Sequence, residues 1–98
     1  MWKSVGYYNG EMGPLEEMKV PMGDRALYFG DGIYEATCVA NRVPFALDEH
    51  LDRTYNSLRL LEIPFTMGRE EIKGELQKVV DAAEDSPIHF LYWQISRG

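Results

Sequence analysis

The sequence of 98 residues is poor in cysteine and histidine: Cys38 is the only thiol, and His50 and His89 are the only imidazoles. One cysteine cannot form a disulfide within the chain or a paired-cysteine metal site. Two histidines without suitable spacing do not indicate a metal centre either. A lone thiol fits a reducing compartment, so the sequence predicts a cytoplasmic protein.

Long hydrophobic runs and an excess of positive charge are also missing. No apolar stretch approaches the length of a membrane span, and the opening MWKSVGYYNG lacks the apolar core of a secretory signal. Ten basic against 16 acidic residues give a formal charge of -6, which repels phosphate backbones and anionic lipid headgroups. We therefore expect neither nucleic acid nor a membrane as a partner.

The first half of the chain has the pattern of strands and turns. Asn9-Gly10 is a typical turn pair and predicts a hairpin, and the prolines and glycines of residues 14–32 predict an extended connection with turns. IYEATCVA, residues 33–40, alternates as a strand, with Ile33 and Glu35 on one face and Tyr34 and Ala36 on the other. After a turn, VPFAL is expected to pair back on it.

Two helices and a closing strand are predicted in the second half. Asp48 and Thr66 are the expected helix caps, and the helices are expected to stop near Pro64 and Pro87. The apolar stripes are Leu47, Leu51, Tyr55, Leu58 and Leu61 for the first helix, and Ile72, Leu76, Val79, Val80 and Ala83 for the second.

The closing strand, IHFLYWQIS, is expected to place Leu91, Trp93 and Ile95 on one face. The order of elements predicts a single α+β domain of two layers, a mostly antiparallel sheet with two helices on one face. A chain with 45% hydrophobic residues can bury one modest core of this kind.

The segment GDGIYE, residues 30–35, is the first candidate for chemistry. A dinucleotide-binding loop needs a third glycine and a following helix, and both are missing, so the favoured interpretation is a turn. Tyr34 and Glu35 are neighbours on a strand, so at most one of them faces a site. Spacing alone favours a core tyrosine and a Glu35 paired with a basic residue such as Arg25 or Arg53.

The flank of the first predicted helix is the second candidate. His50 and Arg53 share this flank, where an arginine can hold a phosphate by paired hydrogen bonds. Spacing alone favours the plainer alternative, a solvated ion pair with Asp52 or Glu49. Schiff-base chemistry requires a lysine that is desolvated or near another cation, and none is placed that way. The lysines are Lys3, Lys19, Lys73 and Lys78.

Three pieces of sequence together resemble a known family. DRALYFGDGIYE, FALDEHLDR and the closing SRG follow one another as in the N-terminal part of D-amino acid aminotransferases, which are class IV (fold type IV) pyridoxal phosphate enzymes. The resemblance covers nearly the whole chain. It implies that Tyr34 approaches cofactor and substrate with Ala36 on the same wall, that Arg53 binds the cofactor phosphate, and that His50 supports the helix.

The resemblance also implies that part of the site lies elsewhere. In such enzymes the lysine that bonds the cofactor belongs to a second domain, as do the acidic partner of the pyridine nitrogen and a loop that holds the substrate carboxylate. We therefore expect residues 1–98 to be the small N-terminal domain, with no catalytic residue of its own and unable alone to hold pyridoxal 5'-phosphate. The full-length enzyme is expected to be a dimer that moves an amino group between a D-amino acid, such as D-alanine, and a 2-oxo acid.

Two other functions stay open at this point. A branched-chain aminotransferase or an aminodeoxychorismate lyase shares the glycine turn and the helix arginine, although GYYNG and YEATC are closer to the D-amino acid group. A small acidic binding module without catalysis also fits these residues. A reading frame that continues past Gly98 into a lysine-bearing domain would favour the enzyme, and a stop codon there would favour the module.

Overall fold

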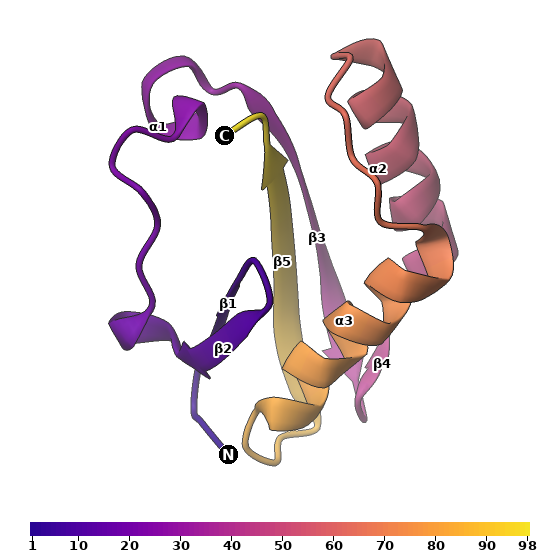
Figure 1. Ribbon diagram of the computed structural model, residues 1–98. Helices are drawn as coiled ribbons and strands as arrows, with labels where there is room; N and C mark the ends of the chain where they lie inside the picture. The colour runs from indigo at the N-terminus through magenta and orange to yellow at the C-terminus, as the bar shows by residue number, and fades with distance from the viewer.

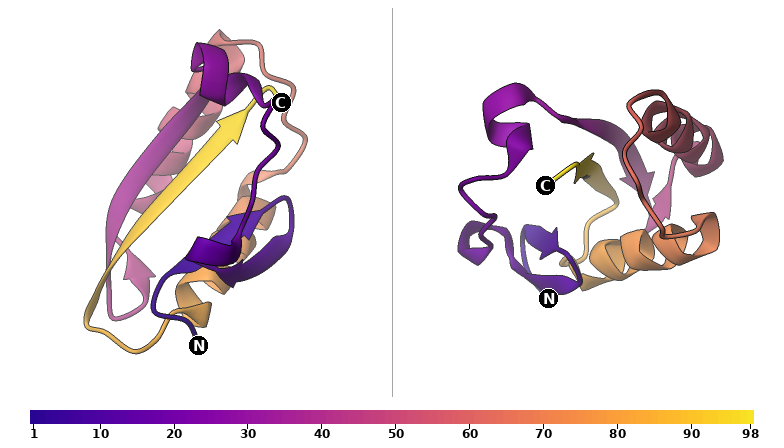
Figure 2. Two further views of the ribbon diagram at one scale, coloured as in Figure 1. Left: turned by 90° about the vertical axis from the view of Figure 1, so that its left-hand side faces the viewer. Right: turned by 45° about the horizontal axis from the view of Figure 1, so that its top comes forward.

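The computed structural model describes all residues from Met1 to Gly98 and has the predicted α+β architecture (Figure 1). In chain order the elements are β1 (Val5–Tyr8), β2 (Glu11–Pro14), the 3-10 turn η1 (Leu15–Glu17), α1 (Arg25–Phe29), β3 (Gly32–Ala40), β4 (Val43–Pro44), α2 (Leu47–Leu60), α3 (Arg69–Ala82) and β5 (Ile88–Ser96). β4, β3 and β5 form an antiparallel sheet in that order, and β1 and β2 form a separate hairpin. The long helices α2 and α3 pack against one face of the larger sheet, and its other face is open (Figure 2, left).

The two long strands alternate between a buried and an exposed face, as their sequences predict. In β3, Thr37 and Val39 are buried, whereas Tyr34 is exposed. In β5, Leu91 and Trp93 are buried, and the alternate residues Phe90, Tyr92 and Gln94 are exposed. The register pairs every residue of β3 with one of β5, so the buried residues of both strands lie on the side of the helices.

The core lies between this buried face and the apolar stripes of the helices. Its main cluster consists of Val39, Leu51, Ile72, Leu76, Val80, Leu91 and Trp93. Leu51 is completely buried, which contributes about 1.5–3 kcal/mol relative to an exposed leucine. The predicted stripes are confirmed except at Leu61, which follows the end of α2 and is 43% exposed.

Both predicted helix caps are wrong. α2 begins after Ala46, which has a positive φ of 52°, so Asp48 lies inside the first turn. Its negative charge there still interacts favourably with the helix dipole. α3 begins after Gly68 instead of Thr66, and it ends at Ala82, well before Pro87. The free carbonyls at that end accept hydrogen bonds from Arg42, which no local pattern predicts.

The N-terminal half agrees with the sequence in the hairpin and differs in the connection. Asn9 and Gly10 both have positive φ, as the tight turn requires. The connection is extended for most of its length, but Arg25–Phe29 forms the short helix α1, capped by Asp24, whose carboxylate accepts a hydrogen bond from the backbone N–H of Ala26. Five residues are too few to show a helical stripe in the sequence. The predicted strand VPFAL is only two residues long, Val43–Pro44.

Candidate functional site

The glycine turn before β3 is a structural junction. Gly30 ends α1 with a φ of 61°, a left-handed conformation that glycine adopts without strain. Gly32 lies so close to β5 that a Cβ atom would be 2.7 Å from the carbonyl oxygen of Ile95. A strand follows the turn, so no helix N-terminus is present to bind a phosphate. The turn interpretation is confirmed.

Arg97, from the closing SRG, ties this turn to the end of α2. Its Nε donates to the carboxylate of Asp31 at 2.8 Å, and its two Nη atoms donate to the carbonyl oxygens of Leu61 and Glu62 at 2.7 and 3.1 Å. Arg97 and Leu61 are 36 residues apart in the sequence. Arg97 therefore joins distant segments of the chain at one end of the sheet.

The open face of the sheet carries a wall of aromatic side chains. Tyr34 is 68% exposed, so the interpretation of Tyr34 as a core residue is wrong. Its ring stacks on that of Tyr92, with 5.8 Å between the ring centres, and Tyr92 pairs in register with Ala36. Tyr92 was not among the predicted site residues, although the alternation of β5 already places it opposite the buried Leu91 and Trp93.

Glu35 lies on the other side of β3 and accepts two hydrogen bonds at one oxygen. Its Oε1 is 2.8 Å from Nη2 of Arg53 and 2.7 Å from Nδ1 of His50. Burial raises the pKa of the Glu35 carboxyl, but the hydrogen bonds from Arg53 and His50 outweigh burial and hold that pKa below its usual value. Glu35 is therefore ionised at neutral pH, and its predicted pairing with Arg53 is confirmed.

His50 is held on several sides and has a fixed tautomer. Its Nδ1 must carry the proton because the carboxylate of Glu35 is only an acceptor, so the 3.0 Å approach of Arg53 to the same nitrogen is a contact and not a hydrogen bond. The imidazole ring packs edge-on against the ring of Trp93, with 6.1 Å between the ring centres. Trp93 donates to Thr54, and Thr54 donates to the carbonyl oxygen of His50. His50 therefore anchors α2 to the sheet.

Arg53 presents most of its guanidinium to solvent. Its side chain is 66% exposed, and the hydrogen bond to Glu35 uses one N–H of Nη2. The same hydrogen bond raises the pKa of the guanidinium, which is charged at neutral pH in any case. The alternative pairing with Asp52 is wrong because Asp52 pairs with Arg69. A charged guanidinium that is held in place by Glu35 and has unused N–H donors is suited to bind a phosphate.

The structure places the predicted site residues in two groups. Tyr34 and Ala36 lie on the open face of β3, whereas Arg53 lies with Glu35 on the side of the helices. β4 pairs only with Val39 and Ala40, so at the level of Glu35 the strand β3 is the outer edge of the sheet. The two groups are therefore separated by the thickness of a single edge strand.

No lysine of the chain resembles an activated amine. Lys73 forms an ion pair with Asp48 at 2.8 Å, and the hydrogen bond to Asp48 raises the pKa of the amine, opposite to what a lysine nucleophile needs. Lys78 pairs with Glu75 at 3.1 Å, and Lys3 and Lys19 are exposed.

No group of three histidine, cysteine, aspartate or glutamate side chains is arranged to hold a metal ion. No helix has both the length and the hydrophobicity that a membrane-spanning helix requires.

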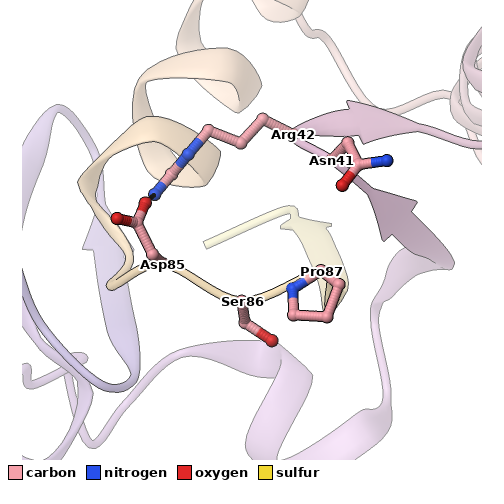
Figure 3. A pocket seen from close by; sticks show the side chains of 5 residues that line it. All are labelled: Asn41, Arg42, Asp85, Ser86 and Pro87. Atoms are coloured by element: carbon pink, nitrogen blue, oxygen red, sulfur yellow. Dashed lines mark hydrogen bonds and ion pairs between the residues drawn. The ribbon is translucent and has the colours of Figure 1, made fainter.

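A hollow at the far end of β3 has a structural explanation. It has a volume of about 500 Å³ and is lined by Asn41, Arg42, Asp85, Ser86 and Pro87 (Figure 3). The guanidinium of Arg42 is turned toward the carboxylate of Asp85, 2.7 Å away, and also bonds the carbonyl oxygens that end α3. These three hydrogen bonds give Arg42 a structural role at the end of α3.

Comparison with known proteins gives a family and several named relatives. Residues 32–98, which include Tyr34, Ala36 and Arg53, match the family described as "Amino-transferase class IV". The chain is 35% identical to the D-alanine aminotransferase of Bacillus licheniformis over 91 residues, which are 93% of this chain and 32% of that protein. It is 34% identical over 92 residues to the D-alanine aminotransferase of Staphylococcus aureus strain MSSA476, which covers 94% of this chain and 32% of that protein.

A relative of a different name is also similar. The putative branched-chain-amino-acid aminotransferase of Methanocaldococcus jannaschii is 36% identical over 66 residues, 67% of this chain and 23% of that protein. The chain spans about a third of the length of the D-alanine aminotransferases that it matches.

Proposed function

The chain belongs to the class IV aminotransferase family, and we propose that residues 1–98 are the small N-terminal domain of a longer enzyme that moves an amino group between a D-amino acid, such as D-alanine, and a 2-oxo acid. The main support is the guanidinium of Arg53, which a hydrogen bond to Glu35 holds beside the edge of β3. Arg53 lies within the residues that match the family. The names of several relatives support D-alanine as the amino donor. The longer enzyme is proposed to be a homodimer, as the resemblance implies, and to be cytoplasmic, as the single cysteine suggests.

The family uses pyridoxal 5'-phosphate, which supplies an electron sink when it is bound. Of the residues present, Arg53 fits its phosphate, because its guanidinium is charged, exposed and only partly used. None of the four lysines fits its carbonyl carbon. Lys73 and Lys78 are in ion pairs, and Lys3 and Lys19 are exposed to water instead of desolvated. Arg53 would thus hold one end of the cofactor, and the lysine that bonds the other end would come from outside residues 1–98.

Glu35 and His50 position Arg53. An arginine side chain loses considerable rotamer freedom when it binds an anion, and a hydrogen bond already made to Glu35 reduces that loss. His50 holds the other hydrogen bond to Glu35 and keeps the carboxylate oriented. Neither group is proposed to transfer a proton.

The open face of β3 would form the substrate wall. Because β3 is the sheet edge at this level, a ligand whose phosphate binds Arg53 can pass over the edge and lie against Tyr34 and Ala36. The stacked rings of Tyr34 and Tyr92 would orient the substrate and exclude water from one side of it.

The test is an assay of the full-length product of the same reading frame. With pyridoxal phosphate, D-alanine and 2-oxoglutarate, this product should form pyruvate, whereas the 98-residue chain should form none above the rate of the cofactor alone. L-Valine in place of D-alanine tests the branched-chain alternative, which the Methanocaldococcus relative favours. Faster transamination of L-valine, or a stop codon after Gly98, would overturn the proposal, and the stop codon would favour a small binding module.

A further inference from the structure

Gln94 lies beside the exposed tyrosine pair on the open face of the sheet. In the register of β3 and β5 it is directly opposite Tyr34, and it is itself exposed. Tyr92 precedes Gln94 by two residues, so both side chains leave the same face of β5. The hydroxyl of Tyr92 donates a hydrogen bond of 2.8 Å to Oε1 of Gln94. Gln94 therefore binds one tyrosine of the pair and is the cross-strand neighbour of the other.

The two tyrosine rings are ordered without being buried. Tyr34 and Tyr92 are diagonal neighbours across β3 and β5, a separation that aromatic side chains can bridge. Their rings are 22° from parallel, with 5.8 Å between the ring centres, and offset stacking is a favoured geometry for such a pair. Tyr34 is 68% exposed and Tyr92 is 51% exposed. Burial in the core therefore does not hold these rings in place.

The hydrogen bond to Gln94 restrains Tyr92. An exposed side chain ordinarily exchanges between rotamers within nanoseconds. Tyr92 is held at both ends, because its backbone belongs to β5 and its hydroxyl is bonded to Gln94. Ala36, the cross-strand partner of Tyr92, is too small to hold the ring. The side chain of Tyr34 makes no hydrogen bond within the domain, so its orientation follows that of the Tyr92 ring on which it stacks.

We propose that Gln94 is a positioning residue of the aminotransferase site: its hydrogen bond fixes the ring of Tyr92, and this ring sets the orientation of Tyr34 toward the substrate. The proposal rests on the proposed function, in which Tyr34 is part of the substrate wall. Gln94 acts through Tyr92 and does not have to touch the substrate. Arg53 lies with Glu35 on the other side of β3, so the effect of Gln94 is on the substrate and not on the cofactor phosphate.

Steady-state kinetics of the full-length product test this role. Gln94→Met keeps the length of the side chain and removes the acceptor oxygen. It should lower kcat/KM for D-alanine about tenfold, mainly through kcat, because a misplaced Tyr34 fits the transition state less well. The dissociation constant of pyridoxal phosphate should stay the same. An unchanged kcat/KM, or a loss accompanied by weaker cofactor binding, would overturn the proposal.

A double-mutant cycle tests whether the hydrogen bond is the cause. Tyr92→Phe removes the donor and keeps the ring, so it should have the same effect as Gln94→Met, and the double variant should be no worse than either single variant. Losses that multiply in the double variant would contradict the proposal. Tyr28→Phe is the matched control, since Tyr28 is 62% exposed and lies on α1. Its kinetics should equal those of the wild type, and a loss equal to that of Tyr92→Phe would also contradict the proposal.

Nuclear magnetic resonance tests the positioning without activity. In the cofactor-free full-length product with labelled tyrosine rings, the wild type should show a nuclear Overhauser contact between the rings of Tyr34 and Tyr92, and Gln94→Met should weaken it. An active product whose ring contact does not depend on Gln94 overturns only the positioning role. A product that shows this dependence but does not transaminate overturns only the proposed function.

Discussion

Nη2 of Arg53 lies 2.8 Å from Oε1 of Glu35, and this hydrogen bond joins helix α2 to the edge strand of the sheet. The two side chains differ in exposure. That of Arg53 is 66% exposed, whereas that of Glu35 is only 11% exposed. A buried carboxylate thus orients a guanidinium that remains open to an anion. The proposed role of Arg53 depends on this arrangement.

Removal of the Arg53 side chain should weaken cofactor binding. In the full-length product, Arg53→Ala loses hydrogen bonds to a charged group, so the dissociation constant for pyridoxal phosphate should rise roughly tenfold to a hundredfold. Arg59→Ala is the matched control, since Arg59 is an exposed arginine of the same helix that bonds only Asn56. Titration by cofactor absorbance or fluorescence measures both. An unchanged dissociation constant in Arg53→Ala would leave Arg53 as a purely structural ion-pair residue.

Glu35→Gln should reduce stability in a pH-dependent way. The pKa of Glu35 is lower in the folded protein than its usual value of 4.5, so its contribution is fully present above that pH and is lost as the pH falls through the lowered pKa. The difference in thermal midpoint between the wild type and Glu35→Gln should therefore be largest near neutral pH and shrink below about pH 4.5.

Glu84→Gln is the control for this series, because Glu84 is exposed and its side chain forms no ion pair. Its thermal midpoint should follow that of the wild type at every pH. A difference for Glu35→Gln that stays constant down to pH 3 would mean that the ionised carboxylate does not stabilise the fold.

Two tyrosine variants distinguish a substrate wall from a core position. Tyr34→Phe in the full-length product should leave the thermal midpoint unchanged, because the residue is 68% exposed, while turnover falls. Tyr55→Phe removes a hydrogen bond of 2.8 Å to the carbonyl oxygen of Met67, so it should cost about 1 kcal/mol of stability and leave turnover intact. Midpoints and steady-state kinetics on the same preparations test this contrast. Lost stability with normal turnover in Tyr34→Phe would contradict the proposed role of Tyr34.

The alternation of β3 and β5 could be predicted from sequence, but which face is covered could not. Period-two patterns separate Tyr34 from Glu35 whatever surrounds them. Burial depends on where the helices pack, and α2 and α3 both take the face of Val39, which leaves Tyr34 exposed. The polar Glu35 on the covered face is tolerated because His50 and Arg53 satisfy it.

Long-range contacts account for the other differences between the expected and the observed structure. Arg42 caps α3 from 38 residues away, and Arg97 holds the end of α2 from 36 residues away, so neither cap has a local signature. Asp48 and Thr66 are predicted as caps because their residue types often precede a helix. In the structure the residues before the helices are Ala46 and Gly68, and neither makes a side-chain cap hydrogen bond. The pairing of Glu35 with Arg53 was one of the alternatives that spacing left open, and the fold selects it.

The central claim is that these residues provide the phosphate-binding and substrate-wall parts of an aminotransferase site but not its lysine. Borohydride reduction makes the bond between pyridoxal phosphate and its lysine permanent, and mass spectrometry of the digested full-length product then identifies that lysine. We predict that the cofactor is found on a lysine outside residues 1–98. Its stoichiometric attachment to Lys3, Lys19, Lys73 or Lys78 would contradict the claim.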